Sequence, residues 1–182
     1  MIKVTPTSLP EVLMLEPKVF HDARGFFFES WNARVFEQAC GMAQEFVQDN
    51  HSHSVQHVLR GLHYQVVRPQ GKLVRVLSGR VFDVAVDLRR SSPRFGQWCG
   101  VELSADNARQ LWVPAGFAHG FLVLSEHADV LYKTTDYWMP EHERGLAWND
   151  PALNIQWPIS ATPLLSDKDA QAPYLSQAET FA

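Results

Sequence analysis

Residues 72–88 read KLVRVLSGRVFDVAVDL, and this stretch decides the fold class. Within it, apolar residues occupy positions 82, 84, 86 and 88, and aspartates occupy positions 83 and 87. A period of two is typical of a β-strand with one buried and one solvated face. Residues 72–77 are a second strand candidate. Because the glycine of Ser78-Gly79 tolerates positive φ, we expect a tight turn there and a β-hairpin.

Short segments of the same kind recur along the chain and predict further strands. They lie at residues 26–31, 46–49, 58–67, 100–103, 111–113, 120–124 and 130–138. One helix is predicted from an N-cap at Asn32 to Cys40, with Gly41 as its stop signal. Many short strands with one or two short helices predict a mainly β, antiparallel sandwich. The jelly roll, as in cupin-like proteins, is the version that encloses a ligand cavity.

Composition narrows the class of protein. The chain has 182 residues, 46% of them apolar, without repeats or low-complexity linkers, so we expect a single domain over residues 1–182. A net charge of −4 argues against nucleic acid as a partner. No segment approaches the ~20 apolar residues of a membrane span, so no membrane association is expected. The two distant cysteines, Cys40 and Cys99, and the absence of a signal-peptide pattern at the N-terminus predict a cytoplasmic location.

The segment LRGLHYQ, residues 59–65, places Arg60 and His63 inside an otherwise apolar strand. Polar groups held on a rigid strand usually have a functional task, although a lone histidine is more often a satisfied core residue. The two side chains have opposite parity on an ideal strand. Both can reach one cavity only if Gly61 permits a β-bulge or if they act at different points along the cavity.

Three other residues complete a set that can move protons. Lys72 begins a strand, Tyr132 lies within another, and Asp169 lies in the segment LSDKD near the C-terminus. With His63 they supply a base, a carboxylate that orients it, a cation and a phenolic acid. This set suits proton abstraction next to a carbonyl. Taken singly, Tyr132 could equally be a half-buried strand tyrosine and Lys72 a solvated lysine.

The segment DARGFFFES, residues 22–30, is the second cluster of interest. It is either a turn that leads into an aromatic edge strand or a ligand contact, with Arg24 for phosphate and aromatic rings for a nucleobase. Gln48, Asn50 and Arg60 would extend its polar wall. His119 lies beside a glycine, where the backbone can approach a ligand closely.

His51-Ser52-His53 has a spacing that puts two imidazoles on one face of a strand, as in some metal sites. A metal site of the cupin type also needs a third histidine or a carboxylate, and the histidine at 63 stands alone, so we expect no metal. Two other functions remain as alternatives: a metal-dependent cupin oxygenase and a sugar-binding jelly roll without catalytic activity.

The chain resembles the dTDP-4-dehydrorhamnose 3,5-epimerase family, a resemblance that spans nearly the whole sequence. It is carried by DARGFFFES, QDNHS, LRGLHYQ, PAGFAHGF, YKTTDYW, ERGLAWNDPALNIQWP and LSDKD. The resemblance implies a metal-free, cofactor-free jelly roll. It implies a homodimer with exchanged N-terminal segments, a dTDP-4-keto-6-deoxysugar as substrate, inversion at C3 and C5, and a place in dTDP-L-rhamnose synthesis.

The resemblance also implies roles for particular residues. It makes His63 the base, Asp169 its partner, Tyr132 the proton donor and Lys72 the cation beside the enolate. The implied substrate contacts, some of them from the other subunit, are Arg24, Glu29, Gln48, Asn50, Arg60, Lys72, His119, Glu143 and Lys168.

The sequence departs from the family pattern at residues 137–138. The family usually has two tyrosines there, whereas this chain has Tyr137 followed by Trp138, so one hydroxyl is lost from the aromatic wall. A sibling enzyme that inverts only C3 or only C5 of a related sugar is the nearest alternative.

Overall fold

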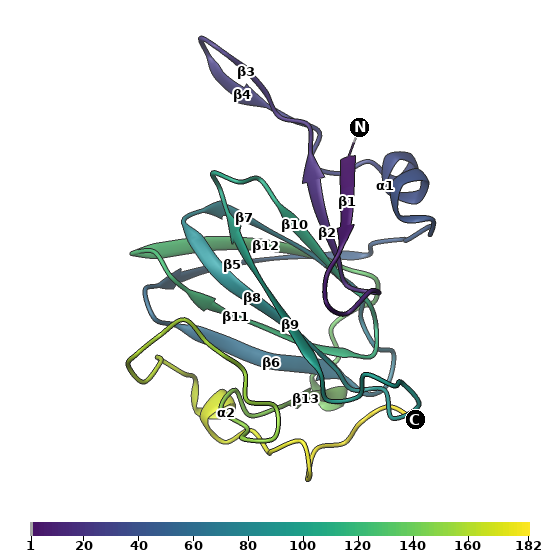
Figure 1. Cartoon of the computed structure of the whole chain (residues 1–182), viewed down its shortest axis with the longest axis vertical. Coiled ribbons are helices and arrows are strands. Elements are labelled where there is room, and N and C mark those ends of the chain that lie inside the picture. Colours follow the sequence, from purple (N-terminus) through teal and green to yellow (C-terminus); the bar gives the residue numbers. More distant parts are fainter. Residues whose placement is uncertain (1) are drawn as a thin grey trace.

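The computed structural model describes residues 2–182, and two antiparallel β-sheets that face each other dominate it (Figure 1). The larger sheet contains, in spatial order, β1 (Ile2–Pro6), β2 (Leu13–Pro17), β10 (Gln110–Val113), β7 (Lys72–Ser78), β12 (His127–Thr134) and β5 (Gln48–Val55). The smaller sheet contains β13 (Glu143–Gly145), β6 (Leu59–Gln65), β11 (Phe117–Val123), β8 (Arg80–Asp87) and β9 (Trp98–Ser104).

The remaining elements are short. β3 (Phe20–Asp22) and β4 (Gly25–Phe27) form a separate hairpin that projects away from the two sheets in Figure 1. The helices are α1 (Ala33–Cys40), the 3₁₀ turn η1 (Pro140–His142) and α2 (Asp167–Ala170). The predicted mainly β, antiparallel, cupin-like jelly roll with short helices is therefore confirmed. No helix within residues 2–182 is long and apolar enough to cross a membrane.

Helix α1 begins and ends where the sequence predicts. The side chain of Asn32 accepts a hydrogen bond from the backbone N–H of Val35. Gly41 adopts the left-handed conformation, with φ of 71°, and donates its backbone N–H to Glu37. The two caps satisfy backbone groups that a short helix would otherwise leave without partners.

The predicted hairpin between residues 72–77 and 81–88 is wrong. β7 pairs with β10 and β12 in one sheet, whereas β8 pairs with β11 and β9 in the other. Ser78-Gly79 is instead a corner at which the chain crosses between sheets. A Cβ on Gly79, whose φ is +76°, would lie 2.0 Å from the carbonyl oxygen of His127, so only glycine fits this corner. The tight turn is real, but strand pairing depends on partners far away in the sequence.

The aspartates of β8 do not form the solvated face that their alternation predicts. Asp83 and Asp87 are fully buried between the sheets, where they pair with His119 and Arg89. The opposite, apolar face of β8 packs beneath the C-terminal part of the chain, including Trp157. Both faces of the strand are therefore covered, and the polar face is the internal one.

Three apolar clusters hold these layers together. The largest fills part of the space between the two sheets and includes Val76, Val81 and Phe121. A second lies between the smaller sheet and the C-terminal segment, which contributes Ile155 and Trp157. The third joins α1 to the larger sheet. The first cluster leaves part of the interior open, and the polar side chains gather in that part.

Strand boundaries differ from the prediction where the apolar pattern is weak. β1 and β2 were not predicted, and β5 extends over the polar run at residues 50–55. The strand predicted at residues 26–31 is only the short β4, and the one predicted to reach residue 138 ends at Thr134.

Candidate active site

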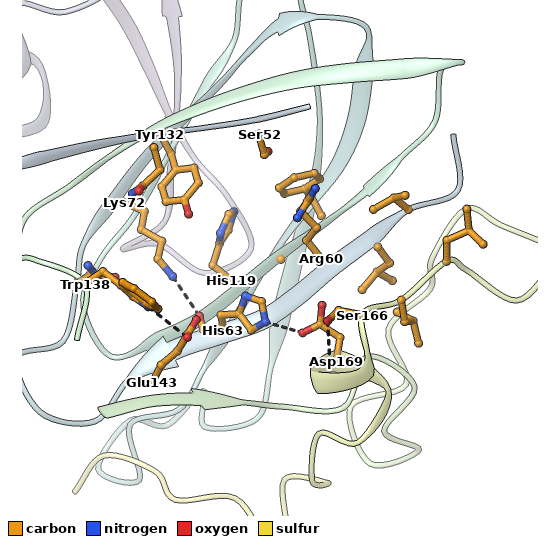
Figure 2. A pocket seen from close by; sticks show the side chains of 18 of the residues that line it. Ser52, Arg60, His63, Lys72, His119, Tyr132, Trp138, Glu143, Ser166 and Asp169 are labelled. Carbon is orange, nitrogen blue, oxygen red and sulfur yellow. Dashed lines mark hydrogen bonds and ion pairs between the residues drawn. The ribbon is translucent and has the colours of Figure 1, made fainter. Parts of the chain in front are cut away.

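A cavity of about 550 Å³ lies between the two sheets (Figure 2). Both sheets contribute polar side chains to it, and the segment that contains α2 closes one side. The lining residues with polar side-chain groups are Gln48, Asn50, Ser52, Arg60, His63, Gln70, Lys72, His119, Tyr132, Trp138, Glu143, Ser166 and Asp169. Nine of the twelve residues that the sequence nominated for catalysis or substrate contact are among them; Arg24, Glu29 and Lys168 are not.

His63 and Asp169 form a close pair across 106 residues of sequence. Nε2 of His63 lies 2.5 Å from Oδ1 of Asp169. Asp169 belongs to α2, and the helix is fixed locally because the Ser166 hydroxyl caps the Asp169 backbone N–H. Burial opposes ionisation of Asp169, but the hydrogen bond from His63 outweighs it, so the pKa of this carboxyl lies below its usual value. An ionised Asp169 accepts the proton on Nε2 and leaves Nδ1 of His63 as the basic nitrogen.

A bulge at Gly61 brings Arg60 and His63 to the same cavity. In the pairing of β6 with β11, His63 lies opposite His119 and Arg60 lies opposite Phe121, so the register shifts by one residue between them. Gly61 has φ of +104°, and the peptide bond that follows it is cis. A Cβ at this position would lie 2.7 Å from the carbonyl oxygen of His119. The predicted role of Gly61 is therefore confirmed, because no other residue fits there without displacing the backbone.

Lys72 reaches the cavity from the larger sheet. Its ammonium group donates a hydrogen bond of 3.1 Å to the backbone carbonyl of His63, and the residue is only 7% exposed. Burial lowers the pKa of Lys72 to about 8, against the opposing effect of the Glu143 and Asp83 carboxylates. The amine thus keeps its charge at neutral pH but lies close to its titration range.

Tyr132 projects from β12 of the larger sheet, on the other side of the cavity from His63 (Figure 2). Burial raises the pKa of its phenol, and the charge of Glu143 raises it further. The group therefore remains a protonated phenol, which is the state needed to donate a proton.

His119 is held by a fully buried carboxylate. Its Nε2 lies 2.8 Å from Oδ1 of Asp83, and the two side chains are 7% and 0% exposed. Asp83 was predicted to face solvent, so the sequence missed this pair. The bond fixes the orientation of the His119 ring in the cavity wall.

At the mouth of the cavity, Glu143 is bound by two side chains. Its Oε2 lies 2.5 Å from Nζ of Lys168 and accepts a 3.2 Å hydrogen bond from the indole N–H of Trp138. Burial disfavours the charge on Glu143, but the bond from Lys168 and the nearby His63 hold the pKa of this carboxyl below its usual value. Lys168 itself stands at the rim and is half exposed.

Arg60 on β6 reaches across to β5 of the larger sheet. Its guanidinium donates to the hydroxyl of Ser54, at 2.9 Å, and to the backbone carbonyl of His53. On the same strand β5, the amide of Gln48 donates to that of Asn50, at 2.9 Å. These groups form a polar wall at the positions that the sequence predicts.

Arg24 and Glu29 do not join the cavity of their own chain. The Arg24 side chain, at the turn between β3 and β4, is 90% exposed and bonds only to the neighbouring Asp22. Glu29 follows β4 and accepts a hydrogen bond from Asn32. Neither is among the residues that line the cavity.

The His51–His53 pair faces away from the cavity. On β5 the side chains of Gln48, Asn50 and Ser52 line the cavity, so the alternate residues point outward. Both imidazoles contact Asp129 at 3.1 Å on the outer face of the sheet. Within residues 2–182, no three His, Cys, Asp or Glu side chains are grouped so as to hold a metal ion.

The sequence missed four lining residues with polar groups: Ser52, Gln70, Ser166 and Trp138, the last of which is noted above only as a departure from the family pattern. The buried hydroxyl of Ser52 has no hydrogen-bond partner within the described chain. The alternation of polar residues along 48–52 is the signal that could have identified it.

Comparisons with known proteins agree on one family. The sequence model of the dTDP-4-dehydrorhamnose 3,5-epimerase family matches residues 6–177. A protein of that name from Pseudomonas aeruginosa is 62% identical over 180 residues, which cover 99% of both chains.

Solved structures extend the likeness to the fold. A dTDP-6-deoxy-D-glucose-3,5-epimerase from Legionella pneumophila, in complex with dTDP-4-keto-L-rhamnose, matches with a TM-score of 0.96 at 52% identity and covers 98% of this chain and 95% of its own. A 3'-monoepimerase from Streptomyces bikiniensis, in complex with dTDP-quinovose, matches with a TM-score of 0.88 at 34% identity and covers 94% and 87%.

Proposed function

The chain belongs to the dTDP-4-dehydrorhamnose 3,5-epimerase family, and from this premise we propose how its cavity inverts two carbons of one sugar. The enzyme is an isomerase that converts dTDP-4-dehydro-6-deoxy-D-glucose to dTDP-4-dehydro-L-rhamnose in dTDP-L-rhamnose synthesis. One observation supports the mechanism above all others. A base, His63, and an acid, Tyr132, project from opposite sheets toward the same cavity.

The first step is removal of a proton next to the ketone. The C4 carbonyl of the substrate acidifies the hydrogens on C3 and C5, so one base can act on either carbon. Nδ1 of His63 takes the proton, and the ionised Asp169 stabilises the imidazolium that results. The electrons of the broken C–H bond pass to the C4 oxygen and form an enolate.

The enolate needs a positive charge beside it. Lys72 supplies a buried ammonium group, and burial strengthens its attraction for the developing oxyanion relative to a solvent-exposed charge. No electrons leave the sugar at any stage, so neither inversion requires a redox partner.

Inversion follows when a proton returns to the opposite face of the ring. Tyr132 donates the phenolic proton to the carbon, the enolate collapses to the ketone, and exchange with solvent then restores both groups. Rotation of the sugar within the cavity presents the second carbon to the same pair of residues.

The polar wall anchors the rest of the substrate. We assign the diphosphate and nucleoside to Arg60, His119, Gln48 and Asn50, with Glu143 and Lys168 at the mouth. A guanidinium gives charge-assisted hydrogen bonds to phosphate oxygens. Binding energy from this remote part holds the reacting ring in position.

A second copy of the chain is part of the proposal. Arg24 lies at the turn of a projecting hairpin, and Glu29 follows it; the hairpin rings Phe20, Phe26 and Phe27 are more than half exposed. Such aromatic surface favours a partner. We assign the hairpin to the partner's cavity in a homodimer with exchanged N-terminal segments, where Arg24 would meet the substrate.

Two broader assignments complete the proposal. We assign residues 1–182 to one domain, supported by an apolar cluster that contains residues from strands of both sheets. We assign the enzyme to the cytoplasm, supported by two cysteines, Cys40 and Cys99, that do not form a disulfide.

Turnover in deuterated water tests the mechanism. Deuterium should enter the sugar at both C3 and C5, and mass spectrometry with proton NMR identifies each carbon. Label at one carbon only would instead identify a single-carbon epimerase such as the one from Streptomyces bikiniensis. Exchange at neither carbon would contradict the proposed function.

A further inference from the structure

We propose that Glu143 sets the protonation states of the reacting groups, and that Trp138 and Lys168 are positioning residues that act through it. The inference rests on the proposed function and gives Glu143 a task beyond contact with the substrate. It concerns the charge balance of the cavity.

The position of Glu143 is tightly determined. It begins β13, which pairs with β6 so that Glu143 lies opposite Gln65 and Gly145 lies opposite His63. Both of its donors, Lys168 and Trp138, bind the same oxygen, Oε2. Figure 2 shows the carboxylate near the end of the Lys72 side chain and close to His63.

Titratable groups on several strands lie around Lys72. Glu143 on β13 and Asp83 on β8 are its acidic neighbours, and His63, His119 and Tyr132 line the same cavity from β6, β11 and β12. Burial lowers the pKa of Lys72, whereas the two carboxylates raise it. The ammonium group therefore depends on their charges.

Tyr132 responds to the same carboxylate in the same direction. After burial, the charge of Glu143 is the main influence that raises the pKa of this phenol, and Arg60 opposes it. One negative charge thus favours the protonated forms of both Lys72 and Tyr132. The reaction needs these two states, a cation beside the enolate and a phenol that can donate.

The two acidic neighbours of Lys72 differ in how they are held. Asp83 is fully buried and bonded to His119, so its charge is part of the core. Glu143 is held by Trp138 and Lys168, both of which are about half exposed at the mouth. The charge inside the cavity therefore depends on side chains at its entrance. At residue 138 the indole N–H supplies a donor where the family usually has a tyrosine.

The test is the pH dependence of kcat in variants that remove the charge or its supports. Glu143→Gln should move the alkaline limb of the profile toward neutral pH by about one unit, because Lys72 loses its proton earlier. Trp138→Phe, which keeps a ring but loses the N–H, and Lys168→Met should move it in the same direction by less. Glu141→Gln is the matched control, since it removes the same charge from an exposed position on η1.

A measurement without turnover covers the case in which a variant is too slow to assay. NMR titration of isotope-labelled Lys72 should show a lower midpoint in Glu143→Gln than in the unmodified chain, and circular dichroism checks the fold. A higher KM with an unchanged pH profile and titration midpoint would overturn the inference, because Glu143 would then only bind substrate. Since the unmodified enzyme would still exchange deuterium, that result is distinct from failure of the proposed function.

Discussion

Arg60 and Arg24 were both predicted to bind the nucleotide sugar, yet the structure places them in opposite surroundings. Arg60 lies on a core strand, and its guanidinium is bound to Ser54 and His53 across the cavity. Arg24 lies on the projecting β3–β4 hairpin and bonds only to Asp22. The cavity is organised by contacts within one chain, whereas the hairpin leaves the rings of Phe20, Phe26 and Phe27 more than half exposed.

This contrast fits the proposed exchange of hairpins between subunits, in which one binding motif is divided between two chains. The orientation of the Arg60 side chain is set before any ligand arrives, which reduces the entropy lost on binding. Arg24 has no such restraint in the single chain. Three experiments test this difference between the preorganised cavity and the hairpin.

The largest effect is expected at His63. His63→Asn removes the base but keeps a polar side chain of similar size, and kcat should fall about 10³-fold or more. Deuterium exchange and steady-state turnover measure the loss. His57→Asn is the control, since His57 is exposed and its φ of 66° suits asparagine. Comparable loss in both variants would show that the cavity does not depend on His63.

A smaller effect is expected from Gly61→Ala. The added Cβ would meet the carbonyl oxygen of His119 at a φ that favours glycine, so the free energy of unfolding should fall by about 2–4 kcal/mol. Turnover should fall roughly 100-fold, because the bulge that aligns Arg60 with His63 is lost. Chemical denaturation and kinetics measure the two effects.

Gly41→Ala is the control for backbone strain alone, since a Cβ at Gly41 meets nothing within 4 Å. We expect it to cost about 1 kcal/mol and to leave kcat unchanged. If Gly61→Ala behaved like this control, the bulge would not organise the cavity.

The smallest effect is expected at the hairpin. Arg24→Ala should lower kcat/KM about 10- to 100-fold through loss of charge-assisted hydrogen bonds, with little change in stability. Mixing this variant with His63→Asn tests where Arg24 acts. If it serves the partner's cavity, a mixed dimer regains one intact site, so random reassortment of equal amounts should restore about a quarter of the sites. No recovery after subunit exchange would place Arg24 in the cavity of its own chain.

Much of the site was predictable because the reacting residues lie in short segments that can be recognised from the sequence. His63, Lys72, Tyr132 and Asp169 were identified by their chemistry and by the resemblance to the family, and they do converge on one cavity. The pairing of β7 with β8 was predicted wrongly. A tight turn specifies the local direction of the chain, but the hydrogen-bond partners of each strand come from distant segments.

The amino-acid sequence by itself determined the β-rich class, the caps of α1, the need for glycine at position 61 and the set of residues able to move protons. These follow from local backbone preference, side-chain periodicity and chemical type. Only the tertiary structure decided that β7 and β8 lie in different sheets, that Asp83 is buried against His119, and that Glu143 is held by Trp138 and Lys168. Such facts depend on which distant surfaces pack together, because burial and charge pairing are properties of the assembled interior.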